Sequence, residues 1–348
     1  MMKSKIALHW LGHCSFWLAA ALVGTAAAAE TVPAATEQDR EWLLGAPPEP
    51  AHNRSTPERI ELGRALFFDP RLSGNGTVSC GSCHNPALGW SDGLRTGVGI
   101  NGTVLGRATP TVVNTAYNTQ FMWDGRKKSL EDQALGPMKT PEEMRTDLAA
   151  AIELLGRLPG YQSMFAKAYP GEAIGEETVA KAIAAFERTV VSNDSRFDRW
   201  VSGDRRAITA QEWRGYQLFK DPAKGNCVVC HAPPNFTDNG YHNVGIAHPS
   251  GAEDLGRYKI RPAAVLKGAF KTPTLRDAEL TAPYFHNGAA ANLADVVAHY
   301  VRGGDDRSNV SKDVRKLDLD AREQADLVAF MKTLTGAVRA ASIPALPQ

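Results

Sequence analysis

The chain has 348 residues, with 39 Lys and Arg against 38 Asp and Glu, and 43% of its residues are hydrophobic. This length is sufficient for two domains with cores of their own. A formal net charge of +1 argues against nucleic acid or an anionic membrane surface as the main partner, and five cysteines are too few for a disulfide-stapled scaffold. Residues 30–348 contain no apolar stretch long enough to span a bilayer.

The N-terminal residues have the pattern of an export signal. Lys3 and Lys5 precede an apolar run centred on residues 16–23, and four alanines follow before Glu30. This pattern predicts a cleaved signal peptide over residues 1–29 and a periplasmic mature protein. A retained membrane anchor is the alternative, but the apolar run is short for a membrane span.

Two segments of similar sequence follow along the chain. A helical pattern that ends in Asp-Pro precedes each of two short cysteine motifs; the patterns cover Glu61–Pro70 and Glu212–Pro222, and the motifs cover Cys80–His84 and Cys227–His231. The repetition predicts two related domains, one over residues 30–203 and one over residues 204–341. The boundary is placed in the polar, basic segment around residues 202–210. Residues 342–348 are expected to form a disordered tail.

The remaining patterns are mainly helical. Apolar residues recur at helical spacing over residues 148–155, 179–190, 293–301 and 327–334. Segments rich in Gly and Pro indicate loops between them, and alternating strand patterns are scarce. The sequence therefore predicts a mostly α fold.

Each cysteine motif has the form C-x-x-C-H, the attachment sequence of c-type haem. Two thiols at this spacing can add to the two vinyl groups of haem, and the adjacent histidine can coordinate the iron. The alternatives are local disulfides, redox C-x-x-C motifs and zinc half-sites, and none of them explains why a histidine follows each cysteine pair. We therefore expect two covalently bound haem c groups, attached through Cys80, Cys83, Cys227 and Cys230, with His84 and His231 as proximal iron ligands.

The second axial ligand decides whether a haem iron transfers electrons or binds an oxidant. No histidine lies between the two motifs, so we expect the first haem to keep an open position that peroxide can bind. After His231 the one methionine is Met331, whose spacing favours core packing. His299 and Tyr300 remain as candidate ligands of the second haem, although spacing alone favours Tyr300 as an ordinary buried aromatic.

The sequence resembles the bacterial di-haem cytochrome c peroxidase/MauG family over essentially the whole mature chain. Besides the two haem motifs, the matching stretches are Leu66–His84, Phe121–Arg126, Leu130–Pro137 and Thr272–Gly288. The resemblance implies a mostly α fold of two cytochrome c-like haem domains packed around a shared interhaem interface.

The resemblance also implies roles for single residues. Trp123 would lie between the haems and link them electronically. Glu143 would be the carboxylate above the peroxide site, with Gln133 and Pro137 in the same pocket. Tyr300 would be the distal ligand of the second haem, as in the MauG branch, where typical peroxidases have methionine.

Two positions depart from the family pattern. Gly225 stands where MauG has a surface tryptophan that draws electrons from its protein substrate. Ala108 stands where the family's interhaem calcium ion takes an asparagine side chain, while Thr281 and Pro283 match the two carbonyl ligands. A more weakly bound calcium ion is therefore expected at most.

The segment around Glu143 has a second interpretation. Thr140-Pro141-Glu142-Glu143 fits a capping box with proline at the first helical position, which predicts that a helix begins here. In that case Glu142 is the alternative proton carrier.

Taken with the resemblance, the sequence predicts an enzyme that reduces hydrogen peroxide with electrons from a small periplasmic donor, a cytochrome c or a cupredoxin. One alternative is a MauG-like enzyme that oxidises residues of a partner protein; Tyr300 favours it and Gly225 disfavours it. The second alternative is a non-enzymatic di-haem electron carrier. The identity of the donor or protein substrate and the formation of a homodimer stay open.

Overall fold

The computed structural model describes residues 31–247, 253–337 and 342–348. The predicted signal peptide over residues 1–29 lies outside the described residues. Residues 32–348 form one unit of structure. Within the described ranges, none of the helices combines the length and the hydropathy that crossing a membrane requires.

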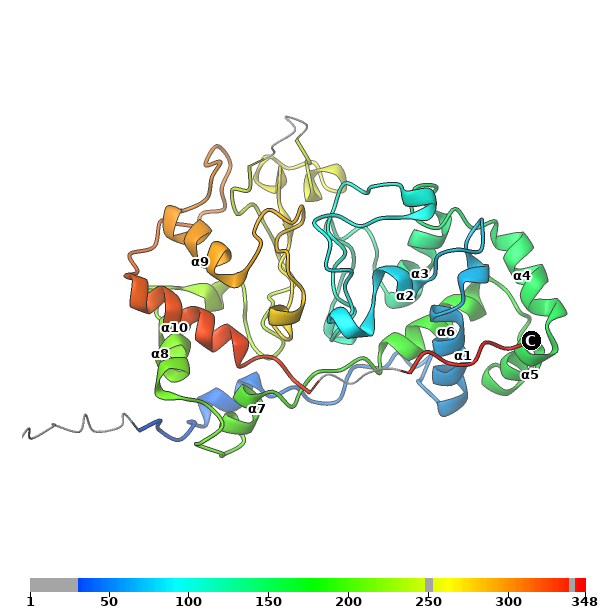
Figure 1. Ribbon diagram of the computed structural model, residues 1–348, viewed down its shortest axis with the longest axis horizontal. Coiled ribbons are helices and arrows are strands. Elements are labelled where there is room, and N and C mark those ends of the chain that lie inside the picture. Colours follow the sequence, from blue (N-terminus) through cyan, green and yellow to red (C-terminus); the bar gives the residue numbers. More distant parts are fainter. Residues whose placement is uncertain (1–30, 248–252, 338–341) are drawn as a thin grey trace, which may run out of the picture. The chain divides into compact units, whose positions relative to one another are not determined.

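Short helices joined by loops make up most of the described residues (Figure 1). The α-helices are α1 (Pro57–Phe67), α2 (Cys80–Cys83), α3 (Leu130–Lys139), α4 (Leu148–Arg157), α5 (Pro159–Ala168), α6 (Glu176–Glu187), α7 (Arg196–Val201), α8 (Ala210–Lys220), α9 (Leu293–Arg302) and α10 (Ala321–Lys332). Strands β1 (Tyr241–His242) and β2 (Phe270–Lys271) pair antiparallel, with Tyr241 opposite Lys271. The mostly α fold predicted from the sequence is confirmed.

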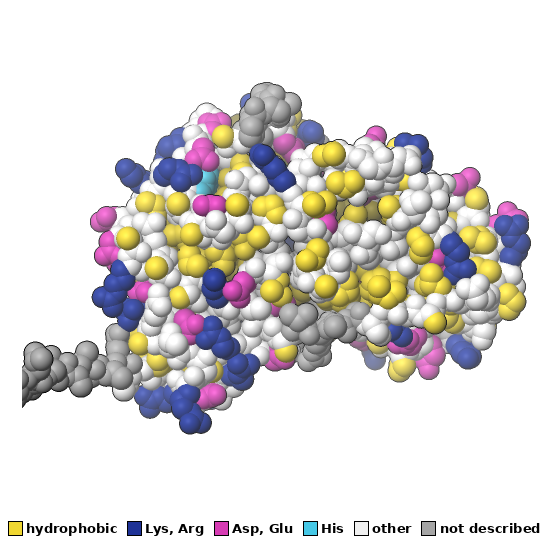
Figure 2. All heavy atoms as spheres, in the orientation of Figure 1, with side chains coloured by type: hydrophobic (Ala, Val, Ile, Leu, Met, Phe, Trp, Pro, Cys, Tyr) yellow, Lys and Arg dark blue, Asp and Glu magenta, His cyan; other side chains and the backbone are white. Residues whose placement is uncertain are grey.

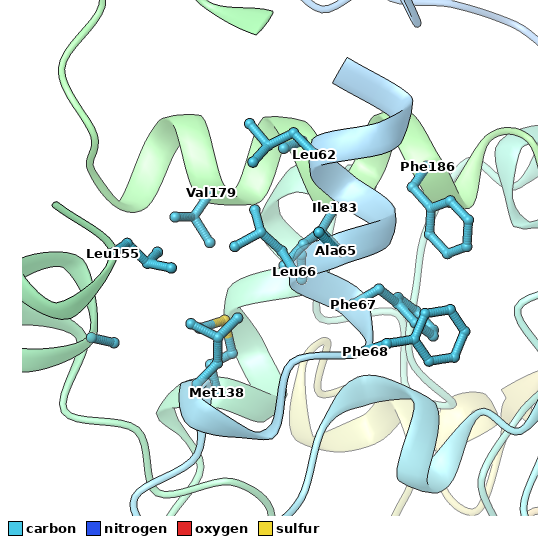
Figure 3. Packing of buried hydrophobic residues seen from close by; sticks show 14 of the residues in the cluster. Leu62, Ala65, Leu66, Phe67, Phe68, Met138, Leu155, Val179, Ile183 and Phe186 are labelled. Atoms are coloured by element: carbon cyan, nitrogen blue, oxygen red, sulfur yellow. The ribbon is translucent and has the colours of Figure 1, made fainter. Parts of the chain in front are cut away.

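The first haem motif is supported by a helix pair, α1 against α6. Figure 3 shows the apolar side chains of α1 packed toward those of α6, among them Leu62, Leu66 and Ile183. The helices approach so closely that a Cβ atom on Gly63 would lie 1.9 Å from the carbonyl oxygen of Ala182. Only glycine permits this crossing, so the position is fixed by packing rather than by helix propensity.

Helices α8 and α10 repeat this arrangement before the second motif. A Cβ atom on Gly215 would lie 1.9 Å from the carbonyl oxygen of Asp326, and 2.8 Å from the Cβ atom of Phe330. In the first pair the corresponding Cβ atom would lie 2.8 Å from that of Phe186. The two helix pairs therefore cross in the same way, which is consistent with two related domains.

The buried residues place the boundary between the two halves differently from the sequence. One apolar cluster extends from Leu62 to Val190, and we call this half the N-terminal lobe. A second cluster contains the core of the C-terminal lobe and also Trp42 and Phe197. The N-terminal segment around Trp42 and helix α7 thus belong to the C-terminal lobe, and the boundary lies between Val190 and Phe197 rather than at 203/204. The polar segment that suggested the later boundary is a surface loop of the C-terminal lobe.

Residues 342–348, predicted from the sequence as a disordered tail, lie against the N-terminal lobe (Figure 1). Arg71 donates from Nη2 to the carbonyl oxygen of Pro347 at 2.9 Å, and the Gly160 amide donates to that of Gln348 at 2.8 Å. Arg64 donates from Nη1 to the carbonyl oxygen of Ser342 at 3.0 Å. These partners are distant in sequence, so the composition of the tail gives no sign of them.

Apolar and charged side chains are distributed unevenly on the surface in Figure 2. Hydrophobic side chains gather over the middle of both lobes, while Lys, Arg, Asp and Glu lie mainly toward the edges. Several exposed apolar residues follow the haem motifs in sequence, among them Leu94, Val104 and Val265.

Candidate functional site

The first C-x-x-C-H motif occupies a single helical turn. The His84 amide donates to the carbonyl oxygen of Cys80 at 2.8 Å, which closes α2. The imidazole Nδ1 of His84 lies 3.2 Å from the carbonyl oxygen of Trp90, so Nδ1 carries the proton and Nε2 keeps its lone pair. Burial lowers the pKa of His84. The imidazole is therefore neutral, which a metal ligand must be.

The second motif has the same local geometry. The His231 amide donates to the carbonyl oxygen of Cys227 at 2.9 Å, and Nδ1 of His231 lies 2.9 Å from the carbonyl oxygen of Phe236. Burial lowers the pKa of His231 as well. Each histidine is thus oriented by a backbone carbonyl group, as metal-ligating histidines commonly are.

The chemistry of the motif cysteines argues against the rival interpretations. None of the four forms a disulfide, and burial raises the pKa of Cys80 and Cys227 to about 12 and that of Cys83 to about 11. The absence of a disulfide within either pair argues against the local-disulfide interpretation. Among the described residues, the one cluster of three metal-ligand side chains joins Cys230 to Asp238 and His242. The two cysteine pairs therefore do not converge on a shared zinc site.

A cavity of about 1050 Å³ connects the two motifs. Its wall contains both cysteine pairs and both motif histidines, together with most of the other candidate residues: Trp123, Gln133, Pro137, Glu143, Thr281, Pro283 and Tyr300. A typical small-molecule site has a volume of about 300–1,000 Å³. At about 1050 Å³ this cavity lies at the upper end of that range.

Trp123 contacts both lobes at the middle of this wall. Its indole Nε1 donates to the carbonyl oxygen of Ala108 at 2.8 Å, within the N-terminal lobe. Its own carbonyl oxygen accepts from the amide of Lys271 in β2 at 2.8 Å, and its ring lies edge-on to His286 with centroids 6.5 Å apart. An aromatic ring therefore lies where the two halves of the cavity meet.

We call the part of the cavity in the N-terminal lobe its first half and the part in the C-terminal lobe its second half. Glu143 is half-buried on the wall of the first half, and no helix begins at this residue. Thr140 is the C-cap of α3, and the next helix, α4, begins at Leu148. The capping-box interpretation is therefore wrong. Burial raises the pKa of Glu143; the charge of Arg126 opposes that rise and the charge of Glu142 adds to it.

The backbone on either side of Glu143 is held by a neighbouring loop. The Ile100 amide donates to the carbonyl oxygen of Glu143 at 2.8 Å. A Cβ atom on Gly99 would lie 2.0 Å from the carbonyl oxygen of Glu142, so only glycine allows this approach. Glu142 also reaches the cavity wall but is exposed, whereas Glu143 is partly desolvated.

Helix α3 supplies two further wall residues of the first half. Gln133 and Pro137 are one helical turn apart and therefore share one face of α3. Arg126, next to this face, pairs with Asp124 at 2.9 Å. The guanidinium group is thus anchored at the edge of the cavity.

Tyr300 of α9 lies on the wall of the second half, and burial raises its pKa. The neighbouring candidate, His299, has both ring nitrogens occupied: Nε2 lies 2.8 Å from the carbonyl oxygen of Val244 and Nδ1 lies 3.2 Å from Asp305. The structure therefore favours Tyr300 over His299 as a ligand. Met331 also reaches the wall, from within the C-terminal core.

Comparisons with known proteins agree with this geometry. A family model described as di-haem cytochrome c peroxidase matches residues 57–206. The methylamine utilization protein MauG of Methylorubrum extorquens is 45% identical over 303 residues, covering 86% of this chain and 84% of that protein. The chain belongs to the di-haem cytochrome c peroxidase family. It is accordingly an oxidoreductase of the peroxidase type, and this argues against the alternative of a non-enzymatic di-haem electron carrier.

Other relatives of the family include enzymes named as peroxidases. The cytochrome c551 peroxidase of Nitrosomonas europaea is 37% identical over 297 residues, covering 84% of this chain and 85% of that protein. The solved structure of a MauG-like protein associated with microbial copper homeostasis matches with a TM-score of 0.79 and 32% identity, covering 86% of this chain and 95% of that chain. The diheme peroxidase BthA from Burkholderia thailandensis matches with a TM-score of 0.72 and 26% identity, covering 83% and 88% of the two chains.

The residues present fit the two haem c groups that this family implies. Each motif brings two thiols to one cavity, and each motif histidine leaves Nε2 for an iron atom. Thr281, Pro283 and Ala108, the residues of the expected calcium position, also line this cavity. Ala108 offers no side-chain oxygen there, and its carbonyl oxygen already accepts from Trp123.

One wall residue was not anticipated from the sequence. Glu187, the last residue of α6, is 5% exposed and lies on the wall of the first half. The internal repeat could have revealed it, because Phe186-Glu187 in α6 corresponds to Phe330-Met331 in α10.

Proposed function

We propose that this protein is a periplasmic peroxidase that reduces hydrogen peroxide to water with electrons from a small redox protein, a cytochrome c or a cupredoxin. The proposal rests on one observation, a single cavity with two unlike halves. Glu143 and Gln133 lie on the wall near the first motif, and Tyr300 lies on the wall near the second. Export to the periplasm follows from the signal predicted over residues 1–29.

In this proposal each motif holds one haem. Cys80 and Cys83 attach the first haem, with His84 on its iron. Cys227 and Cys230 attach the second, with His231 and Tyr300 on its iron. When bound, a haem iron with one open position binds peroxide and delivers electrons to it.

The chain itself handles the protons. Reduction of one peroxide molecule to two water molecules consumes two electrons and two protons, and a proton must reach the departing oxygen. The carboxylate of Glu143 can accept a proton as general base and return it as general acid. Burial raises the pKa of Glu143, so this pKa lies closer to neutral pH than that of an exposed glutamate. Gln133 would orient the substrate by hydrogen bonding.

Trp123 and Tyr300 would serve electron sharing between the two halves. The contacts of Trp123 with Ala108 on one side and with Lys271 and His286 on the other support a bridging role. A tyrosinate ligand is a hard anion that favours higher oxidation states of iron, whereas a thioether favours the lower state. Tyr300 would therefore make the second haem a store of oxidising equivalents.

A second candidate function is the oxidation of residues in a partner protein, as in a MauG-like enzyme. Tyr300 favours it. Gly225 disfavours the same electron route, because it is buried and a Cβ atom there would lie 2.5 Å from the carbonyl oxygen of Leu218. A tryptophan does not fit at this position without movement of the backbone, so protein oxidation would need another exit for electrons.

An interhaem calcium ion would take the carbonyl oxygens of Thr281 and Pro283. Ala108 contributes a methyl group where a side-chain oxygen would be needed, so water would have to complete the coordination shell. Binding is accordingly proposed to be weak.

The functional test is a competition between reductants. The purified holoprotein, with its covalent haem counted, is mixed with peroxide and reduced cytochrome c, and then with peroxide and candidate partner proteins. Rapid, catalytic oxidation of the cytochrome supports the peroxidase. Oxidation confined to a partner protein supports the second candidate instead, and no reaction with peroxide overturns both.

Substituting Tyr300 tests the assignment of the second haem. Tyr300→Met is expected to raise the potential of that haem by on the order of 100 mV, within the roughly 0.8 V range that axial ligands span. Redox titration of the two haems measures it, and electron paramagnetic resonance of the oxidised protein should show one high-spin and one low-spin haem. Tyr258→Met, outside the cavity wall, is the matched control. An unchanged potential in Tyr300→Met would exclude the ligand role.

A further inference from the structure

The first half of the cavity contains a carboxyl group that the proposed function does not use. Glu187 ends α6, is 5% exposed and lies on the cavity wall. Its Oε2 is buried and has no hydrogen-bond partner in the described ranges. The charge of Glu187 contributes to raising the pKa of Cys80, so the carboxyl group acts electrostatically on the attachment site of the first haem.

The internal repeat shows that packing alone does not require an acid here. Gly63 approaches Ala182 and Phe186 as Gly215 approaches Asp326 and Phe330, so α6 and α10 occupy equivalent places. Phe186 corresponds to Phe330, so the next residue in each helix, Glu187 in α6 and Met331 in α10, is also equivalent. Both Glu187 and Met331 line the cavity. The C-terminal lobe thus has a thioether, which does not ionise, where the N-terminal lobe has a carboxyl group.

The groups around Glu187 leave its charge without a dedicated counterion. Arg188 follows it directly, but Nη2 of Arg188 pairs with Glu131 of α3 at 2.7 Å, and Glu131 also accepts from Asn53 at 2.8 Å. The charge of Arg188 favours ionisation of Glu187 and the charge of Glu131 opposes it. From α2 the facing residue is Cys80, whose sulfur has no titratable proton once the haem is attached, and α1 presents aromatic side chains around Phe186. Burial dominates and raises the pKa of Glu187 to about 8.

We propose that Glu187 is a redox-linked proton site of the first haem, protonated beside the reduced haem and releasing its proton when that haem is oxidised. The inference rests on the proposed function, because it requires a haem at the first motif. Oxidation removes one electron, which passes to the oxidant or to the second haem, and leaves an added positive charge beside the carboxyl group. In a buried site this charge favours the carboxylate, so one proton leaves to solvent.

The sign of the pH dependence follows from this coupling. The carboxyl group binds its proton more tightly beside the reduced haem than beside the oxidised one. Between the two pKa values, reduction takes up a proton, so the potential of the first haem falls as the pH rises. The slope is at most about 59 mV per pH unit, the value of a tenfold change for a one-electron couple. Outside that window the potential is independent of this group.

The experiment is a spectroelectrochemical titration of the holoenzyme at a series of pH values from mildly acidic to mildly alkaline. The wild type should show a first-haem potential that falls with rising pH, whereas Glu187→Gln and Glu187→Met should show a much smaller slope. The slope of the second haem, which has Met331 at the equivalent position, should be the same in all three proteins. Glu153→Gln removes an exposed carboxylate paired with Arg157 and is the matched control.

The possible results separate this inference from the proposed function. A slope in Glu187→Gln equal to that of the wild type, or a flat wild-type potential in a protein with two covalent haems, overturns the inference alone. A protein without two covalent haems overturns both. If the variants fail to incorporate haem, reduced-minus-oxidised infrared spectra of the wild type give the second readout. A protonated carboxyl band that grows on reduction and persists in Glu143→Gln supports the inference, and the absence of such a band overturns it.

Discussion

Glu143→Gln is expected to lower kcat/KM for hydrogen peroxide by about 10²–10⁴-fold, the contribution of a positioned general acid and base. Glutamine keeps the shape of the side chain but neither accepts nor returns a proton at neutral pH. Glu142→Gln, which changes the exposed neighbour on the same turn, is the matched control and should retain nearly full activity. Steady-state kinetics with a reduced donor, together with haem spectra that exclude a loading defect, measure the effect.

The pH dependence of kcat/KM is an independent test of the role of Glu143. The free enzyme needs Glu143 as a carboxylate to take the first proton, so kcat/KM should fall as the pH falls through the pKa of Glu143. Burial raises that pKa, so the acidic limb should appear at a higher pH than for an exposed glutamate. The limb should be absent in Glu143→Gln. If instead Glu142→Gln loses the activity and the limb, the assignment of the two glutamates is reversed.

Arg276→Ala is expected to destabilise the holoprotein by about 3–5 kcal/mol, the usual effect of removing one partner of a buried ion pair. Arg276 is fully buried and donates from Nη1 to both carboxylate oxygens of Asp198, at 3.0 and 2.9 Å. From Nη2 it donates to the carbonyl oxygen of Trp42 at 2.6 Å. The substitution would leave the charge of Asp198 buried without its partner and would release the N-terminal segment and α7 from the C-terminal lobe.

Denaturant unfolding of the holoprotein measures this loss. Arg157→Ala, which removes an exposed pair with Glu153 on α4, is the control and should change the free energy of unfolding by less than about 1 kcal/mol. Arg276 also lies over the ring of Phe236, whose carbonyl oxygen orients His231, so the spectrum of the second haem should change before unfolding is complete. Equal stability of the two variants would show that the buried pair contributes little.

The haem motifs and the main helices were accessible from the sequence because their signals are local. C-x-x-C-H places two thiols and an imidazole within five residues, and that covalent spacing does not depend on the rest of the fold. Apolar periodicity likewise predicted α4 and α9 close to their observed bounds. The repeated lead-in predicted a helix before each motif, and α1 and α8 occupy these positions.

Local signals misled where distant packing decided the outcome. The residues from Thr140 onward have the sequence pattern of a helix N-terminus, but α3 continues through Pro137 to Lys139 and Thr140 is its C-cap. The turn that holds Glu143 against the cavity therefore follows a helix instead of starting one. His299 and Tyr300 are adjacent in sequence, yet α9 directs His299 to Val244 and Asp305 and places Tyr300 on the cavity wall.

The sequence alone therefore determined which groups this protein can bind and the class of helical fold that binds them, because both depend on residues close together in the chain. The tertiary structure alone decided which carboxyl and phenol groups share a cavity, which lobe takes Trp42 and α7, and where the C-terminal residues lie. It also placed Glu187 against the first motif. These features depend on contacts between residues far apart in the chain, and the free energy of such contacts comes from burial in the assembled fold rather than from local spacing.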